Sequence, residues 1–225
     1  MEIAEIISNL DNLEFSGITT FPALLLDNKK KKVVATQNLK TLKQVAEKLR
    51  TGGWEALEIN APGTTASSVI PILAEAGATQ IESGHGLTGS TPLHALQELP
   101  EKPAMLYISE VSHIYQGDPY CFGGGLYIDP VFPPYHVKCL VGKDPDMLLK
   151  TSVDIEMPAS IAIDYYGILK PEKNLNIRIG DTVIMGFRAQ VFVTRAYIAG
   201  ISGISQGKPV IKGITTASGT RISWP

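Results

Sequence analysis

Two short segments rich in glycine and hydroxyl side chains have the residue types that bind an anion. Residues 60–68 read Asn-Ala-Pro-Gly-Thr-Thr-Ala-Ser-Ser, and residues 84–91 read Gly-His-Gly-Leu-Thr-Gly-Ser-Thr. Each segment follows a strand-like run, and the first precedes a helix-like run. Free N–H groups and the dipole at a helix N-terminus favour negative charge, and hydroxyl groups add donors. Because the phosphate sites of α/β barrels follow consecutive strands, the two segments predict one phosphate held from two sides.

The candidate phosphate ligands are the small and hydroxyl-bearing residues of these two segments. They are Gly63, Thr64, Thr65, Gly84, His85, Gly86 and Thr88. Residues without bulk allow the backbone to approach an anion closely. The first segment is also compatible with an ordinary helix cap by Thr65 or Ser67, and the second with a tight turn between domains.

The first hundred residues show alternating helix and strand patterns. Apolar residues at helical spacing predict helices over residues 3–10, 38–50 and 67–76, and short apolar runs predict strands over residues 15–20, 56–59 and 78–82. This alternation favours parallel strands joined by crossover helices. About three strands are too few for a closed parallel barrel, which needs eight. We therefore expect either a partner that completes the sheet or a front part that this chain lacks.

The pattern changes near residues 100–103, which read Pro-Glu-Lys-Pro. Strand-like runs separated by Gly and Pro follow, at residues 104–109, 126–128, 136–141, 160–165, 181–185 and 189–197. Many short strands with turns between them are typical of a small barrel or sandwich. The sequence thus predicts a partial α/β barrel over residues 1–100 and a β-domain over residues 101–225.

Composition excludes several classes of protein. Hydrophobic residues make up 44% and charged residues 19% of the 225 residues, which is typical of a soluble globular protein. The net charge of −2 does not suggest binding to nucleic acid or to an anionic membrane, and the basic run at residues 29–32 is typical of a solvated turn. Two cysteines, Cys121 and Cys139, are too few for a disulfide scaffold. With no apolar run long enough to span a bilayer and an acidic N-terminus, we expect a cytoplasmic protein.

Four sequence blocks together resemble the YhfX-like family. They are residues 17–22 (Gly-Ile-Thr-Thr-Phe-Pro), 60–65, 84–94 and 120–127, the last reading Tyr-Cys-Phe-Gly-Gly-Gly-Leu-Tyr. Residues 179–183 and 186–190 also fit. That family is similar to alanine racemase and to the fold-type III enzymes that use pyridoxal 5'-phosphate. The resemblance covers nearly the whole chain, but only the second part of the barrel and the β-domain of such an enzyme.

The resemblance implies a racemase that moves a proton at an amino-acid α-carbon, with pyridoxal 5'-phosphate as cofactor. It also implies a departure, because no lysine stands where such enzymes carry their Schiff-base lysine. The lysines before residue 100 lie in the polar run 29–32 or on the predicted helix 38–50, and the others follow from Lys102 onward. We therefore expect a truncated form. It would bind a small amino-acid substrate as a homodimer, or after complementation by a missing N-terminal barrel half.

By resemblance, a tyrosine of the β-domain serves as one of the two proton-transfer groups. Tyr115 or Tyr120 fits that role, with His113 in the same predicted polar loop, residues 109–125. A phenol can act in this way if a nearby cation lowers its pKa. Packing at the domain junction explains these tyrosines equally well. For His85, stacking on the cofactor ring, a bond to its phosphate and a plain loop position all stay open.

Three other functional interpretations compete with a racemase. A lyase of the D-threonine aldolase or D-serine dehydratase type would use the same carbanion. A non-catalytic cofactor-binding fragment, or a phosphosugar or nucleotide module, would use only the phosphate segments.

A metal site built from His113, Cys121, His136 and Cys139 has spacing unlike a compact zinc site, so we predict none. Arg188 and Arg195 are weaker candidates for binding a substrate carboxylate.

Overall fold

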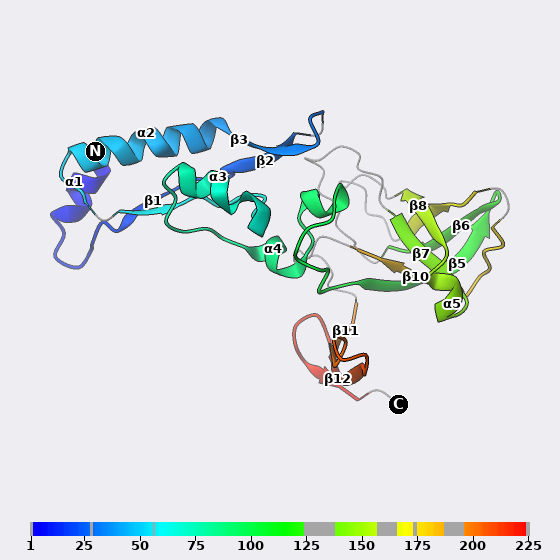
Figure 1. The fold of residues 1–225 in the computed structure, drawn as a ribbon. Coiled ribbons are helices and arrows are strands. Elements are labelled where there is room, and N and C mark those ends of the chain that lie inside the picture. Colours follow the sequence, from blue (N-terminus) through cyan, green and yellow to red (C-terminus); the bar gives the residue numbers. More distant parts are fainter. Residues whose placement is uncertain are drawn as a thin grey trace. The chain divides into compact units, whose positions relative to one another are not determined.

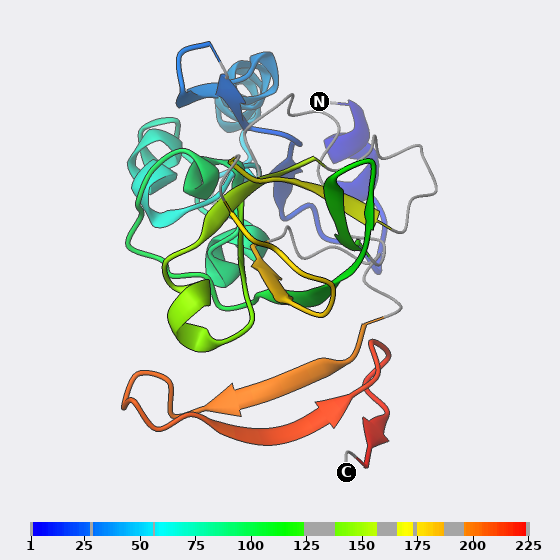
Figure 2. The same cartoon turned by 90° about the vertical axis from the view of Figure 1, so that its right-hand side faces the viewer.

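The computed structural model describes residues 2–27, 29–55, 57–123, 138–156, 166–172, 175–186 and 196–223. The chain divides into two compact units, Met1–Ala104 and Met105–Pro225. Figures 1 and 2 show helices and short strands in the first unit and strands in most of the second. Mixed α/β content is thus followed by a β-domain, as the sequence predicts.

A short parallel sheet lies at the centre of the first unit. Strand β1 (Gly17–Thr19) pairs in parallel with β4 (Glu58–Asn60), and Asn60 forms a parallel bridge to Gln80. The prediction of parallel pairing is confirmed, although the expected strand over residues 78–82 is reduced to this single bridge. Among the described residues, β1 has no strand on its other side.

Helix α2 (Gln37–Thr51) connects the first two predicted strands, and its ends follow from local chemistry. The hydroxyl of Thr36 accepts the N–H of Leu39, and the N–H of Gly52 donates to the carbonyls of Lys48 and Leu49. Its buried stripe consists of Leu39, Leu42, Ala46 and Leu49. This i, i+3, i+4 spacing was the basis for the predicted helix over residues 38–50, which is confirmed.

A hairpin that the sequence analysis did not predict precedes α2. Strands β2 (Leu24–Asp27) and β3 (Lys32–Ala35) pair in antiparallel fashion, with the basic run largely in the turn between them. Helix α1 (Glu2–Ser8) begins the unit, and its apolar side chains Ile3 and Ile6 are exposed.

The helix predicted over residues 67–76 forms as the 3-10 turn η1 (Ser67–Val69) followed by α3 (Ile70–Glu75). We expected the second glycine-rich segment to be a turn or loop. The structure instead shows the short helix α4 (Gly84–Thr88) there. Gly89 ends it with a φ of 63°, a left-handed conformation that glycine adopts without strain. The 3-10 turn η2 (Pro92–Ala95) follows.

Six strands of the second unit close into an antiparallel barrel. They are β5 (Tyr107–Tyr115), β6 (Asp118–Phe122), β7 (Lys138–Gly142), β8 (Ser152–Glu156), β9 (Tyr166–Lys170) and β10 (Thr182–Met185). Around the barrel their order is β10-β5-β6-β9-β8-β7. Helix α5 (Pro145–Leu148) lies between β7 and β8. The predicted barrel-or-sandwich architecture is therefore a closed barrel, which leaves no unpaired strand edge.

Alternation of side chains fills the barrel interior. Residues of β8 are alternately exposed and buried along Ser152–Glu156, the period expected of a strand with one apolar face. The buried cluster comprises Val111, Cys121, Cys139, Val141, Val153, Ile155, Leu169, Ile177, Val183 and Met185. Every barrel strand contributes at least one of these residues.

The prediction of a polar loop over residues 109–125 is wrong, because most of this segment forms the β5–β6 hairpin. Tyr115 pairs with Asp118, so only Gln116 and Gly117 connect the strands. Both have positive φ, 51° and 88°, which suits the twist of a two-residue hairpin turn. The polar residues of this segment face outward while Val111 and Cys121 face the core, so high polarity concealed a strand.

A separate three-stranded sheet completes the second unit. It consists of β11 (Ile198–Ser202), β12 (Val210–Thr215) and β13 (Arg221–Ile222), and Figure 2 shows β11 and β12 as a long ribbon. Cross-strand neighbours Ile201 and Ile211 are both exposed, at 48% and 62%. No described helix has the length and apolar character needed to cross a membrane.

Candidate functional site

The two segments predicted to hold a phosphate lie against each other in the first unit. Gly86 of α4 packs so closely on the turn after β4 that a Cβ atom at this position would stand 2.1 Å from the carbonyl oxygen of Thr65. Only glycine allows such an approach between two backbones. The backbone amides of Thr64 and Gly86 have no acceptor among the described residues. The arrangement therefore brings Thr65 and Gly86 into contact.

The turn at Gly63 and Thr64 has an unusual backbone. Gly63 has a φ of 132°, and a Cβ there would also lie 3.0 Å from the carbonyl oxygen of Leu24. Thr64 has a φ of 47°, a region that β-branched residues rarely occupy. Such conformations occur at ligand-binding sites and persist when the surroundings determine them.

Two groups in this turn already have partners within the protein. The N–H of Gly63 donates to the hydroxyl of Thr65, 3.2 Å away, and the hydroxyl of Thr64 donates to the carbonyl of Leu24, 3.3 Å away. Thr65 is only 5% exposed. The hydroxyl groups therefore stabilise the turn, and no acceptor is seen for the backbone N–H of Thr64 or of Thr65 among the described residues.

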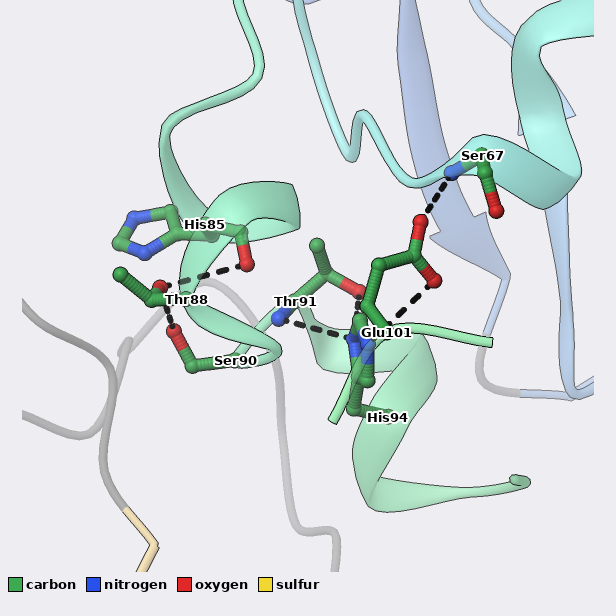
Figure 3. A network of polar contacts seen from close by, with 7 residues as sticks. All are labelled: Ser67, His85, Thr88, Ser90, Thr91, His94 and Glu101. Carbon is green, nitrogen blue, oxygen red and sulfur yellow. Dashed lines mark hydrogen bonds and ion pairs between the residues drawn. The ribbon is translucent and has the colours of Figure 1, made fainter. Parts of the chain in front are cut away.

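A carboxylate of the protein accepts one of the backbone N–H groups that we expected, at the start of a helix, to bind a phosphate. The backbone N–H of Ser67 donates to Glu101 Oε1, and no side chain caps η1 in the way that the sequence suggested. This hydrogen bond is the main reason that the pKa of Glu101 lies below its ordinary value. Figure 3 shows Glu101 between Ser67 and His94.

His94 connects Glu101 to Thr91. The N–H of Thr91 donates to His94 Nδ1 at 3.2 Å, and the Thr91 hydroxyl lies 2.7 Å from the same nitrogen. Because Nδ1 accepts the amide, the neutral ring carries its proton on Nε2, which lies 3.8 Å from Glu101 Oε2. These two atoms are buried and make no hydrogen bond among the described residues. The sequence analysis singled out neither Glu101 nor His94. Ser67, the partner of Glu101, is distant in the sequence, and Thr91, the partner of His94, was assigned to a turn.

The other predicted ligands of the second segment are on α4. The Thr88 hydroxyl lies 2.7 Å from that of Ser90 and donates to the carbonyl of His85 at 3.3 Å. Figure 3 shows the Thr88 hydroxyl between the carbonyl of His85 and the hydroxyl of Ser90. Gly84 is exposed, and a Cβ there would meet nothing within 4 Å. Gly84 is therefore not required for the approach that Gly86 makes.

A second polar cluster lies at the carboxyl ends of the parallel strands. Asn60 Nδ2 donates to Thr19 Oγ1 at 3.2 Å and to Glu82 Oε1 at 2.7 Å, while Asn60 Oδ1 is buried and has no partner among the described residues. Ligands of open α/β sheets bind at this end of the strands. The sequence analysis did not select Thr19 and Glu82, although their positions at the carboxyl ends of strand-like runs provided that signal.

The three residues predicted to transfer protons come together in the second unit. The rings of His113 and Tyr120 stack with centroids 4.7 Å apart, and Tyr115 meets Tyr120 edge to face at 6.5 Å. Tyr166 and Phe122 join them, with Tyr166 edge to face on His113 at 5.1 Å. We call these five residues the aromatic cluster. Tyr166 and Phe122 were not predicted, because strand pairing between β6 and β9 brings them there.

The structure describes three residues of the possible metal site, and they lie in two different environments. Cys121 and Cys139 are buried in the barrel core, whereas the partially exposed His113 lies in the aromatic cluster. Burial raises the pKa of Cys121 to about 11 and that of Cys139 to about 12, which disfavours the thiolate that binds metals. The described residues contain no group of three or more His, Cys, Asp or Glu that could hold a metal ion. His136, Arg188 and Arg195 lie outside the described residues.

Comparison with known proteins supports one part of the predicted resemblance. Residues 106–211 match the YhfX-like C-terminal domain. Over 212 residues the chain is 37% identical to the uncharacterized protein YhfX of Escherichia coli strain K12, covering 94% of this chain and 52% of that protein. The chain thus spans about half the length of this curated relative. The similarity to YhfX is confirmed, and the cofactor and the reaction remain proposals.

One solved structure with a weaker similarity is an alanine racemase of Clostridium difficile 630. It is 15% identical, and the alignment covers 86% of this chain and 59% of that chain with a TM-score of 0.31. A score this low does not establish a common fold.

Proposed function

We propose that the chain binds the phosphate of pyridoxal 5'-phosphate and belongs to a protein of the amino-acid racemase type. The carrying observation is the backbone contact between Thr65 and Gly86, which unites two segments that the sequence predicts as one phosphate site. The amides of Thr64 and Gly86 are the proposed donors, and the left-handed backbone of Thr64 supports a ligand-binding role for this turn. We call this the Thr64–Gly86 site.

The residues present fit the phosphate better than they fit a covalently bound cofactor. No lysine occurs between residues 49 and 101, so neither segment contributes an amine for covalent attachment. When bound, pyridoxal 5'-phosphate withdraws electrons from the α-carbon of an amino acid. The chain itself would hold the phosphate, and His113, Tyr115 and Tyr120 would exchange protons with the substrate. Racemisation and lyase chemistry of the D-threonine aldolase or D-serine dehydratase type both use such groups.

The non-catalytic alternative is supported by that same lack of lysine. A cofactor-binding fragment would need the Thr64–Gly86 site but no proton-transfer groups. We also propose that the exposed apolar face of α1 and the unpaired side of β1 suit either a second copy of the chain or a complementing half-barrel.

A pair of glycine variants tests the phosphate site. Gly86→Ala would force Thr65 away, whereas Gly84→Ala on the same helix meets open space. Calorimetric titration with pyridoxal 5'-phosphate and with inorganic phosphate should show binding by the native protein and by Gly84→Ala. For Gly86→Ala we expect at least roughly a tenfold weaker binding, about 1.4 kcal/mol. Circular dichroism should establish that each variant is folded.

Equal binding by all three proteins, or none by the native protein, would contradict the phosphate site. Borohydride reduction followed by mass spectrometry tests the mode of binding. We expect an unmodified chain, since no lysine lies in either segment. A mass increase that maps to a lysine would instead support covalent binding and an intact racemase mechanism.

A further inference from the structure

Strand β5 has a β-bulge immediately before His113, a member of the aromatic cluster. Val111 pairs with Cys121 and His113 pairs with Tyr120, so two residues of β5, Ser112 and His113, lie opposite a single residue of β6. Ser112 is therefore the extra residue. Bulges of this kind often reorient a side chain near a functional site.

The hydroxyl group of Ser112 makes two contacts that determine where its proton lies. It is 3.1 Å from the carbonyl oxygen of Tyr120 and 2.9 Å from His113 Nδ1. A carbonyl only accepts, and a serine hydroxyl has one proton to donate. Both contacts are hydrogen bonds only if Ser112 donates to Tyr120 and accepts from a protonated His113 Nδ1.

Ring packing holds the imidazole in this orientation. Tyr120 stacks on its face with an interplanar angle of 15°, and Tyr166 meets it at 85°. His113 is only partially buried, so its ring remains accessible. Among the described residues, Nε2 makes no hydrogen bond, in contrast to Nδ1.

We infer that Ser112 is a positioning residue, which fixes neutral His113 in the Nδ1–H tautomer and leaves Nε2 as a proton acceptor on the outer face of the barrel. Nε2 takes the proton from an acidic X–H group of a ligand, the bonding electrons stay on X, and the ring becomes an imidazolium that still donates through Nδ1 to Ser112. That the X–H group is an amino-acid α C–H rests on the proposed function. The tautomer of His113 is independent of that function, because it follows from the two Ser112 contacts.

Nitrogen-15 NMR of the histidine rings tests this inference without any cofactor. The chain has four histidines, so the spectrum of His113→Gln identifies the signals of His113. At about pH 8.5, which favours the neutral imidazole, we expect the native His113 to show a protonated Nδ1 and an unprotonated Nε2. Ser112→Ala should move the proton to Nε2 or produce a mixture, and Ser112→Thr should preserve the native pattern because it keeps the hydroxyl.

Ser109→Ala is the matched control. The Ser109 hydroxyl also donates from β5 to a β6 carbonyl, that of Phe122 at 2.8 Å, but it does not bond to a histidine. Its removal should leave the His113 signals unchanged. A native His113 with its proton on Nε2, or a Ser112→Ala spectrum identical to the native one, would overturn the inference. Failure to bind pyridoxal 5'-phosphate would count against the proposed function and would not alter this spectrum.

Discussion

Glu101 accepts the backbone N–H of Ser67, so a carboxylate of the protein occupies one of the donors expected for a phosphate. The two residues are 34 positions apart in the sequence. Their contact ties the segment after β4 to the segment after η2. The contact also holds the negative charge of Glu101 at Ser67, three residues along the chain from Thr64, where we propose that the phosphate binds.

Removing this charge should strengthen phosphate binding. Glu101→Gln keeps an oxygen that can accept the Ser67 N–H but removes the repulsion between Glu101 and the anion. Two unit charges roughly 8 Å apart interact by about 0.5–2 kcal/mol, so affinity should rise roughly twofold or more at low salt. Titration of both proteins with inorganic phosphate measures the change. The exposed Glu98→Gln is the matched control, and a similar gain from it would show a general charge effect rather than a local one.

Acid should weaken the same contact. The pKa of Glu101 is lowered in the folded protein, first by the Ser67 hydrogen bond, so the ionised form stabilises the fold above the ordinary carboxyl pKa. This contribution is lost as the pH falls through the lowered folded-state pKa. In urea unfolding curves at several pH values, native stability should fall more steeply on acidification than that of Glu101→Gln. Parallel curves for the two proteins would contradict this role.

Barrel stability should depend on core side chains and not on exposed ones. Leu169 is fully buried, and Leu169→Ala should lower the free energy of unfolding by about 2–5 kcal/mol through lost burial and a new cavity. Ile108 is 67% exposed on β5, and Ile108→Ala should change it by less than about 0.5 kcal/mol. Chemical denaturation measures both variants. A large loss for Ile108→Ala would indicate that something covers this face in solution.

The two thiols should be unreactive while the barrel is folded. Burial raises the pKa of Cys121 to about 11, and burial together with the nearby Cys121 raises that of Cys139 to about 12. At pH 8 only about one Cys121 thiol in a thousand would be ionised, even before the limited access is considered. A thiol reagent should therefore react with both cysteines only after unfolding in urea. Rapid reaction of the native protein would contradict their placement in the core.

Local sequence patterns were sufficient for elements whose determinants lie close together in the chain. The stripe of α2 and its caps at Thr36 and Gly52 lie within one short segment, so helical spacing identified the helix. The two glycine-rich segments were likewise visible because glycine and hydroxyl residues have direct chemical meaning. Polar strands such as β5 and β6 were missed, since alternation with one polar face resembles a loop when the polar residues are numerous.

By itself the sequence determined the helix and strand alternation of the first unit, the strand-rich second unit, the two glycine-rich segments and the similarity to YhfX. Only the tertiary structure decided that Gly86 contacts Thr65, that Glu101 reaches Ser67, and that Ser112 is a bulged residue beside His113. The physical reason is distance along the chain. Spacing patterns report which face a residue occupies on its own element, whereas strand register and backbone packing decide which distant residue lies opposite it.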